Sequence, residues 1–518
     1  MLLAILVAVS SVMLGAALSF APSSRGVLGY MRTFATVAAI AVVITHLLPE
    51  ALFELGPISI LLFLAGWFTP ALAHFVGQHS TSGRSAPAVL EAGYWGLVIH
   101  HVADGIGLGT YTRMPPATGS HLDVVVALAA HTVPLIAVVA LAYRVTFGPR
   151  AAIMRSCGLA LAIVFGIALS SLVAARTIEH FSPIISAIAA GLLLHVVTHD
   201  LTEQPPRSVV ARTLDLVVAL GGVAVSFLGV ERDADPATWL FSERLLSLAE
   251  RVSLVVLVGL AAAALSLRLA DRGSKSALAM LPAAPLGADA LLLGIALYGF
   301  TSTALRVGVS ALGLALLPAP PDAEADLVRP AWFARMSQVL ARSGPWLILG
   351  ALLGALLSAV PASAQSRGLS GSLLELGLFA LVANVAPIAA PAALLVALGL
   401  ASLGVSSGAE LLFVTLGPLL VRKSVTLKQR ALVTAICVAV AWLSNLLHVS
   451  SAPLDGALSA SMPGLRFAIA LGALLLFGVW QRGARIWLSA IVKTPAHEHE
   501  HAHDVHGPHA DEYEHSAH

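Results

Sequence analysis

Apolar stretches about as long as a bilayer is thick follow one another along almost the whole chain. A membrane-spanning helix needs roughly 20 apolar residues, and about 16 or 17 such segments fit into the sequence. The composition agrees, because 58% of the 518 residues are hydrophobic and only 11% are charged. A water-soluble globule cannot hide that much apolar surface. We therefore expect an all-α, polytopic helical membrane protein whose first segment is a membrane helix and not a cleaved signal peptide.

Eight of these spans fit into the first 230 residues, separated by short polar connections. Arginines follow the odd-numbered spans more often than the even-numbered ones, by eight to two. Basic connections stay on the cytoplasmic side, so the N-terminus is expected outside, with the chain in a cell inner membrane or plasma membrane. The predicted spans are 1–20, 33–53, 57–77, 90–111, 122–143, 154–174, 181–202 and 211–230.

The second half of the chain predicts a separate membrane module. The charged segment 231–250 is interpreted as a linker, and residues 251–490 as the second module. Its apolar run 373–421 is too long for one span and contains prolines and a glycine-rich stretch, which indicates helices interrupted at membrane depth. Such breaks are tolerated where protein or a water-filled cavity satisfies the freed backbone groups, as in transporters. Small-residue helix packing is an alternative reason for the glycines.

The C-terminal tail, residues 491–518, alternates histidines with acidic residues and has no hydrophobic pattern that would fold it. Imidazole and carboxylate groups suit zinc, nickel and other divalent ions. We interpret the segment as a disordered tail that collects metal, with a solubilising tail or a cloning remnant as the alternatives. Basic residues just ahead of it favour the cytoplasmic side.

Histidines and acids inside the apolar spans are the strongest functional signal. An ionised side chain at the centre of a membrane helix costs roughly 2.5 to 3.5 kcal/mol, so such residues are rarely there without a role. In the fourth span, His100 and Asp104 are four residues apart and share a helix face, while His101 points about 100° away. One turn therefore offers a nitrogen and an oxygen ligand together, which is half of a metal site.

Three other spans repeat this pattern. A proline lies close to the histidine in two of them, where it removes a backbone hydrogen bond and frees a carbonyl oxygen. A single intramembrane histidine is more often a packing residue, but four spans that carry histidine favour a shared site. The further candidates are His46 and Glu50 in the second span, His131 in the fifth, and His195, His199 and Asp200 in the seventh.

The motifs HLLPEAL, HHVADG and HTVPL, in this order within an eight-span layout, resemble the ZIP family of divalent-metal transporters. The resemblance implies a metal site at mid-membrane to which His100, His101, Asp104 and His131 contribute. Thr132 and Ile136 stand where the family's fifth span has acidic residues. The resemblance therefore implies a site reduced from two metals to one, and it leaves open which of the other candidates completes it.

Residues 383–420 of the second module are similar to the repeat of two-repeat membrane permeases that include organoarsenical exporters. That repeat pairs a proline-broken helix with a glycine-rich turn and a closing Gly-Pro. A cysteine that some members place before the first proline is absent here. The stretch GFTSTALRVG, from Gly299, is the candidate for a degenerate second copy of the repeat.

The leading hypothesis is transport of a divalent cation, Zn²⁺ above others, with no enzymatic activity and no bound cofactor besides the ion. Protonation of the histidines near pH 6.5 would weaken binding and make transport pH-dependent. One alternative gives transport to the second module and makes the first a metal-sensing regulator, and another is an intramembrane zinc hydrolase. Structural histidines in a scaffold remain a further alternative. We expect the metal ion and the lipid bilayer as partners and no nucleic acid, because a net charge of +1 indicates no basic surface. A homodimer is left open.

Overall fold

The protein is helical throughout the residues that the computed structural model describes. Within them there is no strand, which confirms the all-α prediction. The described residues are 2–20, 25–56, 58–80, 85–111, 122–172, 181, 183–188, 190–192, 194–195, 208–226, 236–270, 284–317, 332–360, 371–421, 425–447 and 464–492.

Seven helices among the described residues are long and apolar enough to cross a membrane. Their number confirms the prediction of a polytopic membrane protein, and shorter apolar helices lie between them. The seven segments are Gly29–Leu55, Pro149–Leu172, Pro236–Leu267, Ala288–Leu316, Trp332–Ser358, Leu427–Leu446 and Gly464–Arg482.

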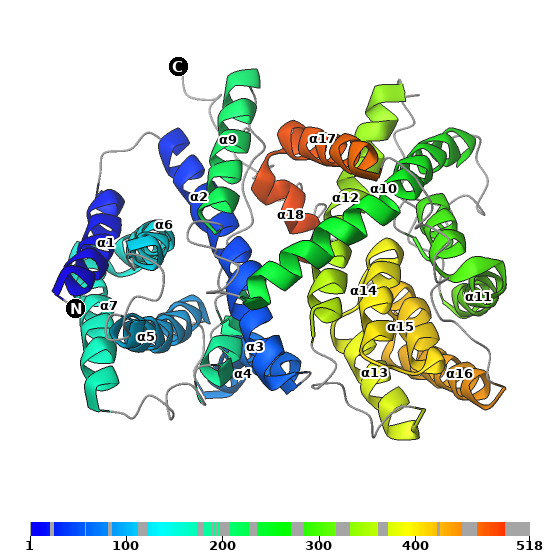
Figure 1. Ribbon diagram of the computed structural model, residues 1–518, viewed down its shortest axis with the longest axis horizontal. Coiled ribbons are helices and arrows are strands. Elements are labelled where there is room, and N and C mark those ends of the chain that lie inside the picture. The colour runs from blue at the N-terminus through cyan, green and yellow to red at the C-terminus, as the bar shows by residue number, and fades with distance from the viewer. Residues whose placement is uncertain are drawn as a thin grey trace, which may run out of the picture.

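The helices of the first module lie together at the left of Figure 1. Most of their bounds agree with the predicted spans to within a few residues, whereas the end of the seventh predicted span lies outside the described residues. The second predicted span is divided by a π-helical turn, η1. The helices are α1 (Leu2–Phe20), α2 (Arg25–Val42), η1 (Val43–Leu47), α3 (Leu48–Leu55), α4 (Ile58–Ser80), α5 (Ser85–Tyr111), α6 (Leu122–Phe147), α7 (Pro149–Leu172) and α9 (Val209–Val225).

Helices α5 and α7 approach each other closely because glycines lie at their crossing. A Cβ atom at Gly105 would lie 2.2 Å from the carbonyl oxygen of Ile163. A Cβ atom at Gly166 would lie equally close, 2.2 Å, to the carbonyl oxygen of Val102. Small residues allow such backbone contact between membrane helices. The crossing therefore holds the turn of α5 that carries the predicted ligands firmly against α7.

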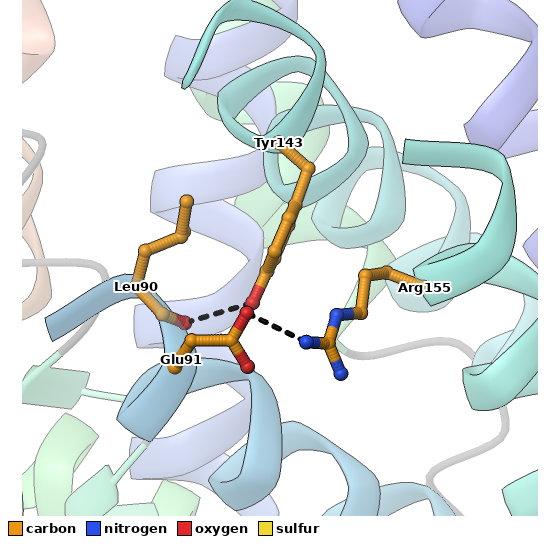
Figure 2. A network of polar contacts seen from close by, with 4 residues as sticks. All are labelled: Leu90, Glu91, Tyr143 and Arg155. Atoms are coloured by element: carbon orange, nitrogen blue, oxygen red, sulfur yellow. Dashed lines mark hydrogen bonds and ion pairs between the residues drawn. The ribbon is translucent and has the colours of Figure 1, made fainter. Parts of the chain in front are cut away.

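A polar network joins α5, α6 and α7 near the start of α5 (Figure 2). The Tyr143 hydroxyl donates to the carbonyl oxygen of Leu90 at 3.3 Å, and Arg155 Nη2 lies 2.7 Å from Glu91 Oε1. The Arg155 guanidinium also stacks 4.6 Å above the ring of Tyr94. Side chains of α6 and α7 therefore both attach to the first turns of α5.

The second module lies to the right in Figure 1 and contains the interrupted helices that its sequence predicts. The run 373–421 forms three short helices with breaks at 386–389 and 403–406, which confirms that prediction. The helices are α10 (Pro236–Ala270), α11 (Ala288–Leu316), α12 (Trp332–Ser358), α13 (Leu373–Val385), α14 (Ala390–Ser402), α15 (Ser407–Leu420), α16 (Leu427–Leu446), α17 (Gly464–Arg482) and α18 (Ala484–Val492).

Helix α10 runs between the two modules and contacts both (Figure 1). It packs on η1 and α3 of the first module and on α11, α12 and α17 of the second. Residues 236–250, which were predicted to belong to a linker, form the beginning of this helix and continue without a break to Ala270. The connection between the modules therefore includes a rigid helix.

A buried carboxylate forms a second joint between the modules. Asp215 of α9 is 8% exposed. It accepts a 2.7 Å hydrogen bond from the Thr33 hydroxyl of α2 and a 2.8 Å bond from the backbone N–H of Ala484. Ala484 is the first residue of α18, so Asp215 satisfies one of the backbone donors that every helix leaves unpaired at its N-terminus.

Candidate functional site

The fourth predicted span forms the continuous helix α5, and its candidate ligands are buried. His100 is 4% exposed and His101 1%. His100 Nε2 lies 3.4 Å from Asp104 Oδ2, and the Asp104 side chain is 14% exposed. The i, i+4 spacing thus brings an imidazole and a carboxylate together inside the bundle, as the sequence predicts.

His101 lies on another side of the same turn. Its Nδ1–H donates to the Leu97 carbonyl oxygen at 2.9 Å, and its ring is edge-on to that of His100, with centroids 5.8 Å apart. A histidine that binds metal commonly donates its other ring N–H to a carbonyl group, because this fixes the tautomer and the ring orientation. The bond to Leu97 therefore leaves Nε2 as the nitrogen suited to a metal.

The second-span candidates lie at the joint with α10. His46 belongs to the π-helical turn η1, and π turns inside helices are frequent at functional sites. Its Nε2 hydrogen-bonds the carbonyl oxygen of Ser226, and its Nδ1 lies 3.4 Å from the Thr238 hydroxyl of α10. Glu50, in α3, is exposed. This histidine thus contacts both the end of α9 and the helix that connects the modules.

The remaining candidates are only partly described. His195 is half-buried and packs edge-on against Trp67 of α4, with ring centroids 5.6 Å apart. His131 lies in α6, but its side chain is outside the described part of the structure, and so are residues His199 and Asp200 as a whole. The first two residues of the predicted tail, 491 and 492, belong to the end of α18, and residues 493–518 lie outside the described part.

Among the side chains that are described, no group of three or more histidine, cysteine, aspartate or glutamate residues lies close enough to hold a metal ion. The described part of the first module supplies an imidazole–carboxylate pair with a second imidazole one residue away. Zinc commonly takes at least three protein ligands, so a complete centre needs another side chain beside this pair. His131, the third ligand that the sequence predicts, is the candidate for it.

The second module contains a cavity that the sequence analysis did not single out. It lies between α11, α14 and α15 and has room for about one water molecule. The residues around it are Tyr298, Ser302, Thr303, Arg306, Leu394, Ala397, Glu410, Leu411 and Val414. Arg306 and Glu410 are 2% and 4% exposed, respectively. A charged residue inside an apolar run signals function in a membrane protein, and that signal was available in the sequence for both.

Helix α11 turns back on itself beside this cavity. Gly299 has φ 76° and ψ 176°, a conformation that only glycine adopts readily. The Arg306 guanidinium donates to the carbonyl oxygens of Pro285 at 3.0 Å and Ala290 at 3.3 Å. In a straight helix, residues 290 and 306 would be about 24 Å apart at 1.5 Å per residue. The two arms of α11 therefore lie side by side as a helical hairpin.

Helices α14 and α15 form a second hairpin with a related turn. Gly404 has φ 77° at its turning point, as Gly299 has φ 76° in α11. The sequences that begin at these two glycines are also similar, GFTSTA from Gly299 and GVSSGA from Gly404. The cavity lies between these two hairpins, since its lining comes from α11, α14 and α15.

Buried hydrogen bonds hold the second hairpin in place. Glu375 of α13 accepts bonds from the Gly371 N–H at 2.8 Å, the Ser406 N–H at 3.1 Å and the Ser406 hydroxyl at 2.6 Å. Asn445 of α16 accepts a 2.7 Å bond from the Gly408 N–H. The broken backbone is thus satisfied by side chains of neighbouring helices, as it must be within a membrane.

Comparison of the chain with models of known protein families, with curated proteins and with solved structures finds no match. The structure by itself establishes a helical membrane protein whose architecture is compatible with transport.

Proposed function

We propose that the protein transports a divalent metal cation, Zn²⁺ above others, and that the first module binds it. The observation that carries this proposal is the buried pair of His100 Nε2 and Asp104 Oδ2, 3.4 Å apart within the helical bundle. A neutral imidazole and a carboxylate are ligands that zinc prefers. Their nitrogen and oxygen atoms take the place of the water molecules that the ion loses when it enters the bundle. The resemblance to the ZIP family supports the same assignment.

In this proposal His131 is the third ligand and His101 Nε2 a further one on the path of the ion. The N-terminus lies outside the cell, and the histidine-rich tail raises the metal concentration on the cytoplasmic side. Metal binding requires deprotonated histidines, so zinc affinity falls as the pH drops through the range in which imidazole takes up a proton.

Zinc uptake into proteoliposomes that contain the full-length protein tests the proposal. We expect uptake to fall to the background of empty liposomes when His100→Ala and Asp104→Ala are combined. The matched control is Glu243→Gln, which removes an exposed carboxylate from α10. Uptake that stays unchanged in the double variant would refute the proposal.

A second candidate function assigns transport to the second module and makes the first a metal-sensing regulator. The cavity between two helical hairpins favours it, because transporters commonly bind their substrates where helices are broken at mid-membrane. The contact of His46 with Thr238 of α10 offers a physical connection between the modules. Zinc uptake that is lost in Glu410→Gln but retained after His100→Ala and Asp104→Ala would favour this function over the first.

A further inference from the structure

We propose that Arg342 of α12 and Arg482 of α17 bind the phosphate headgroup of an anionic phospholipid of the phosphatidylglycerol class in the cytoplasmic leaflet. This inference goes beyond the proposed zinc transport, because the site requires neither zinc nor a side chain of the first module. Three observations carry it, which concern the end of the module where the arginines lie, their uncompensated charge, and the apolar side chains around them.

Helices α12 and α17 pack against each other in opposite directions. The Ser337 hydroxyl of α12 donates to the side-chain oxygen of Gln481, near the end of α17. Further along α12, a Cβ atom at Gly344 would lie 3.4 Å from Cδ2 of Leu475. The contacts thus move towards the start of α17 as they move away from the start of α12. The first turns of α12 and the last turns of α17 therefore lie at the same end of the module.

This end of the module is the one expected on the cytoplasmic side. Arg482 is the last residue of α17, and Ala484 begins α18. The Ala484 N–H donates to Asp215, near the start of α9, and Asp215 also bonds Thr33, near the start of α2. Basic residues at the starts of α2 and α9 favour the cytoplasmic side for both. Anionic lipids of the cytoplasmic leaflet attract basic residues at such positions.

The two arginines carry uncompensated positive charge. Both side chains are exposed at the surface of the bundle, and they lie close enough for their charges to repel each other. Neither guanidinium makes a hydrogen bond or an ion pair with another residue that the structure describes. Arg342 belongs to the candidate membrane span Trp332–Ser358, where an arginine is costly unless it is paired. A phosphate group can accept hydrogen bonds from both guanidinium groups and balance their charge.

The side chains around this end suit a lipid better than a water-soluble anion. Trp332 and Phe333, at the start of α12, are 46% and 77% exposed, and Phe477 of α17 is 36% exposed. Its ring stacks on that of Trp480, with centroids 5.9 Å apart. Tryptophan is enriched at the headgroup level of membranes. Arg342 lies roughly 15 Å along the helix from Trp332, at a depth from which long basic side chains reach towards the headgroups. A phospholipid can therefore place its phosphate on the arginines and its acyl chains on the apolar side chains.

Native mass spectrometry of the purified full-length protein, titrated with phosphatidylglycerol or phosphatidylcholine, tests the proposal. We expect one phosphatidylglycerol molecule to bind about 25-fold more tightly than phosphatidylcholine. This follows from a factor of about five, or 1 kcal/mol, for each arginine near an anionic headgroup. Arg342→Gln or Arg482→Gln alone should lower the preference about fivefold, and the combined variant should abolish it.

The matched control is Arg150→Gln, which removes an exposed arginine from the start of α7 and should keep the full preference. Thermal unfolding in detergent without phosphatidylglycerol checks the fold of the variants. There the midpoint of Arg482→Gln should be at least as high as that of the wild type, because the substitution relieves a repulsion. His100→Ala combined with Asp104→Ala should also keep the preference, which separates a failure of this site from a failure of the zinc site.

Three results would overturn the proposal. One is equal binding of the two lipids by the wild type, or a preference that the combined variant retains. Another is inorganic phosphate that raises the unfolding midpoint as much as phosphatidylglycerol does, which would assign the arginines to a free anion. The third is a preference that appears only when the six acidic residues of the segment 498–514 are replaced by glutamine in the full-length protein. That result would assign the arginines to the acidic tail.

Discussion

The two modules bury polar side chains in different ways. In the first module, His100, His101 and Asp104 project from α5, a single helix of 27 residues. In the second module, Arg306 and Glu410 belong to two hairpins of short helical segments that surround a cavity. An unbroken helix uses its backbone groups internally and offers only side chains to an ion. A broken helix also exposes backbone N–H and C=O groups at the break. Side chains of neighbouring helices must then hydrogen-bond those backbone groups that bind no ligand.

This difference affects what each module offers to a ligand. A site built from side chains of unbroken helices can supply nitrogen ligands, which suits zinc. Helix breaks instead expose backbone groups, which Glu375 and Asn445 satisfy in the second module. Four experiments test the contrast, in order of decreasing expected effect.

Asp104→Asn should reduce zinc uptake about 100-fold, the upper range for loss of groups that support a metal site. The amide keeps the shape of the side chain but removes the negative charge beside His100. Zinc uptake by proteoliposomes measures the effect, with the exposed Glu243→Gln as the control. Uptake equal to that of the control would contradict the role of Asp104 as a zinc ligand.

Glu375→Ala should lower the free energy of unfolding by about 3 kcal/mol, because three donors around the breaks of the second module lose their acceptor. Chemical unfolding in detergent measures the change, with the exposed Glu243→Ala as the control. Since Glu375 lies in the second module, we expect the zinc affinity to be retained. A stability equal to that of the control would contradict the role assigned to the carboxylate.

Gly105→Ala should destabilise the protein by about 2 kcal/mol, since overpacking at a close contact typically costs 1 to 3 kcal/mol. The new Cβ atom would meet the Ile163 carbonyl oxygen and push α5 from α7. The matched control is Gly308→Ala in α11, where a Cβ atom meets no other atom within 4 Å. There we expect stabilisation of up to about 1 kcal/mol from helix propensity. Equal effects of the two substitutions would argue against the close α5–α7 crossing.

Glu91→Gln should have the smallest effect, no more than about 0.5 kcal/mol, because both partners of the Glu91–Arg155 ion pair are about one-third exposed. The stacking of Arg155 on Tyr94 remains in the variant. Unfolding at low and high salt measures the contribution of the charge, which salt should screen. A loss of several kcal/mol would mean that this polar network contributes a large part of the stability of the bundle. It would contradict our view that close packing at the α5–α7 crossing contributes more.

The sequence predicts the helical architecture well because hydrophobic length is a strong signal in a membrane protein. It also predicts the proximity of His100 and Asp104, which depends only on the pitch of a helix. The fold-back at Gly299 was not predicted, because glycine is common in membrane helices and Ala288–Leu316 contains no proline. The π-helical turn at His46 likewise has no sequence signature.

The cavity could be predicted only in part. Arg306 and Glu410 are visible as charges within apolar runs, and the stretch GFTSTALRVG resembles a degenerate copy of the later repeat. That the two residues line one cavity depends on how two hairpins pack, which a single sequence does not encode locally. The predicted linker residues 236–250 illustrate the same limit, because their charges do not prevent them from forming the start of α10.

The most direct measurement of the central claim is X-ray absorption spectroscopy at the zinc edge on the full-length protein loaded with one zinc ion per chain. We expect nitrogen and oxygen ligands about 2.0 to 2.2 Å from the ion, including imidazole, with a spectrum that changes when His100→Ala and Asp104→Ala are combined. An identical spectrum in the wild type and the double variant would contradict it, because the zinc would then be held elsewhere.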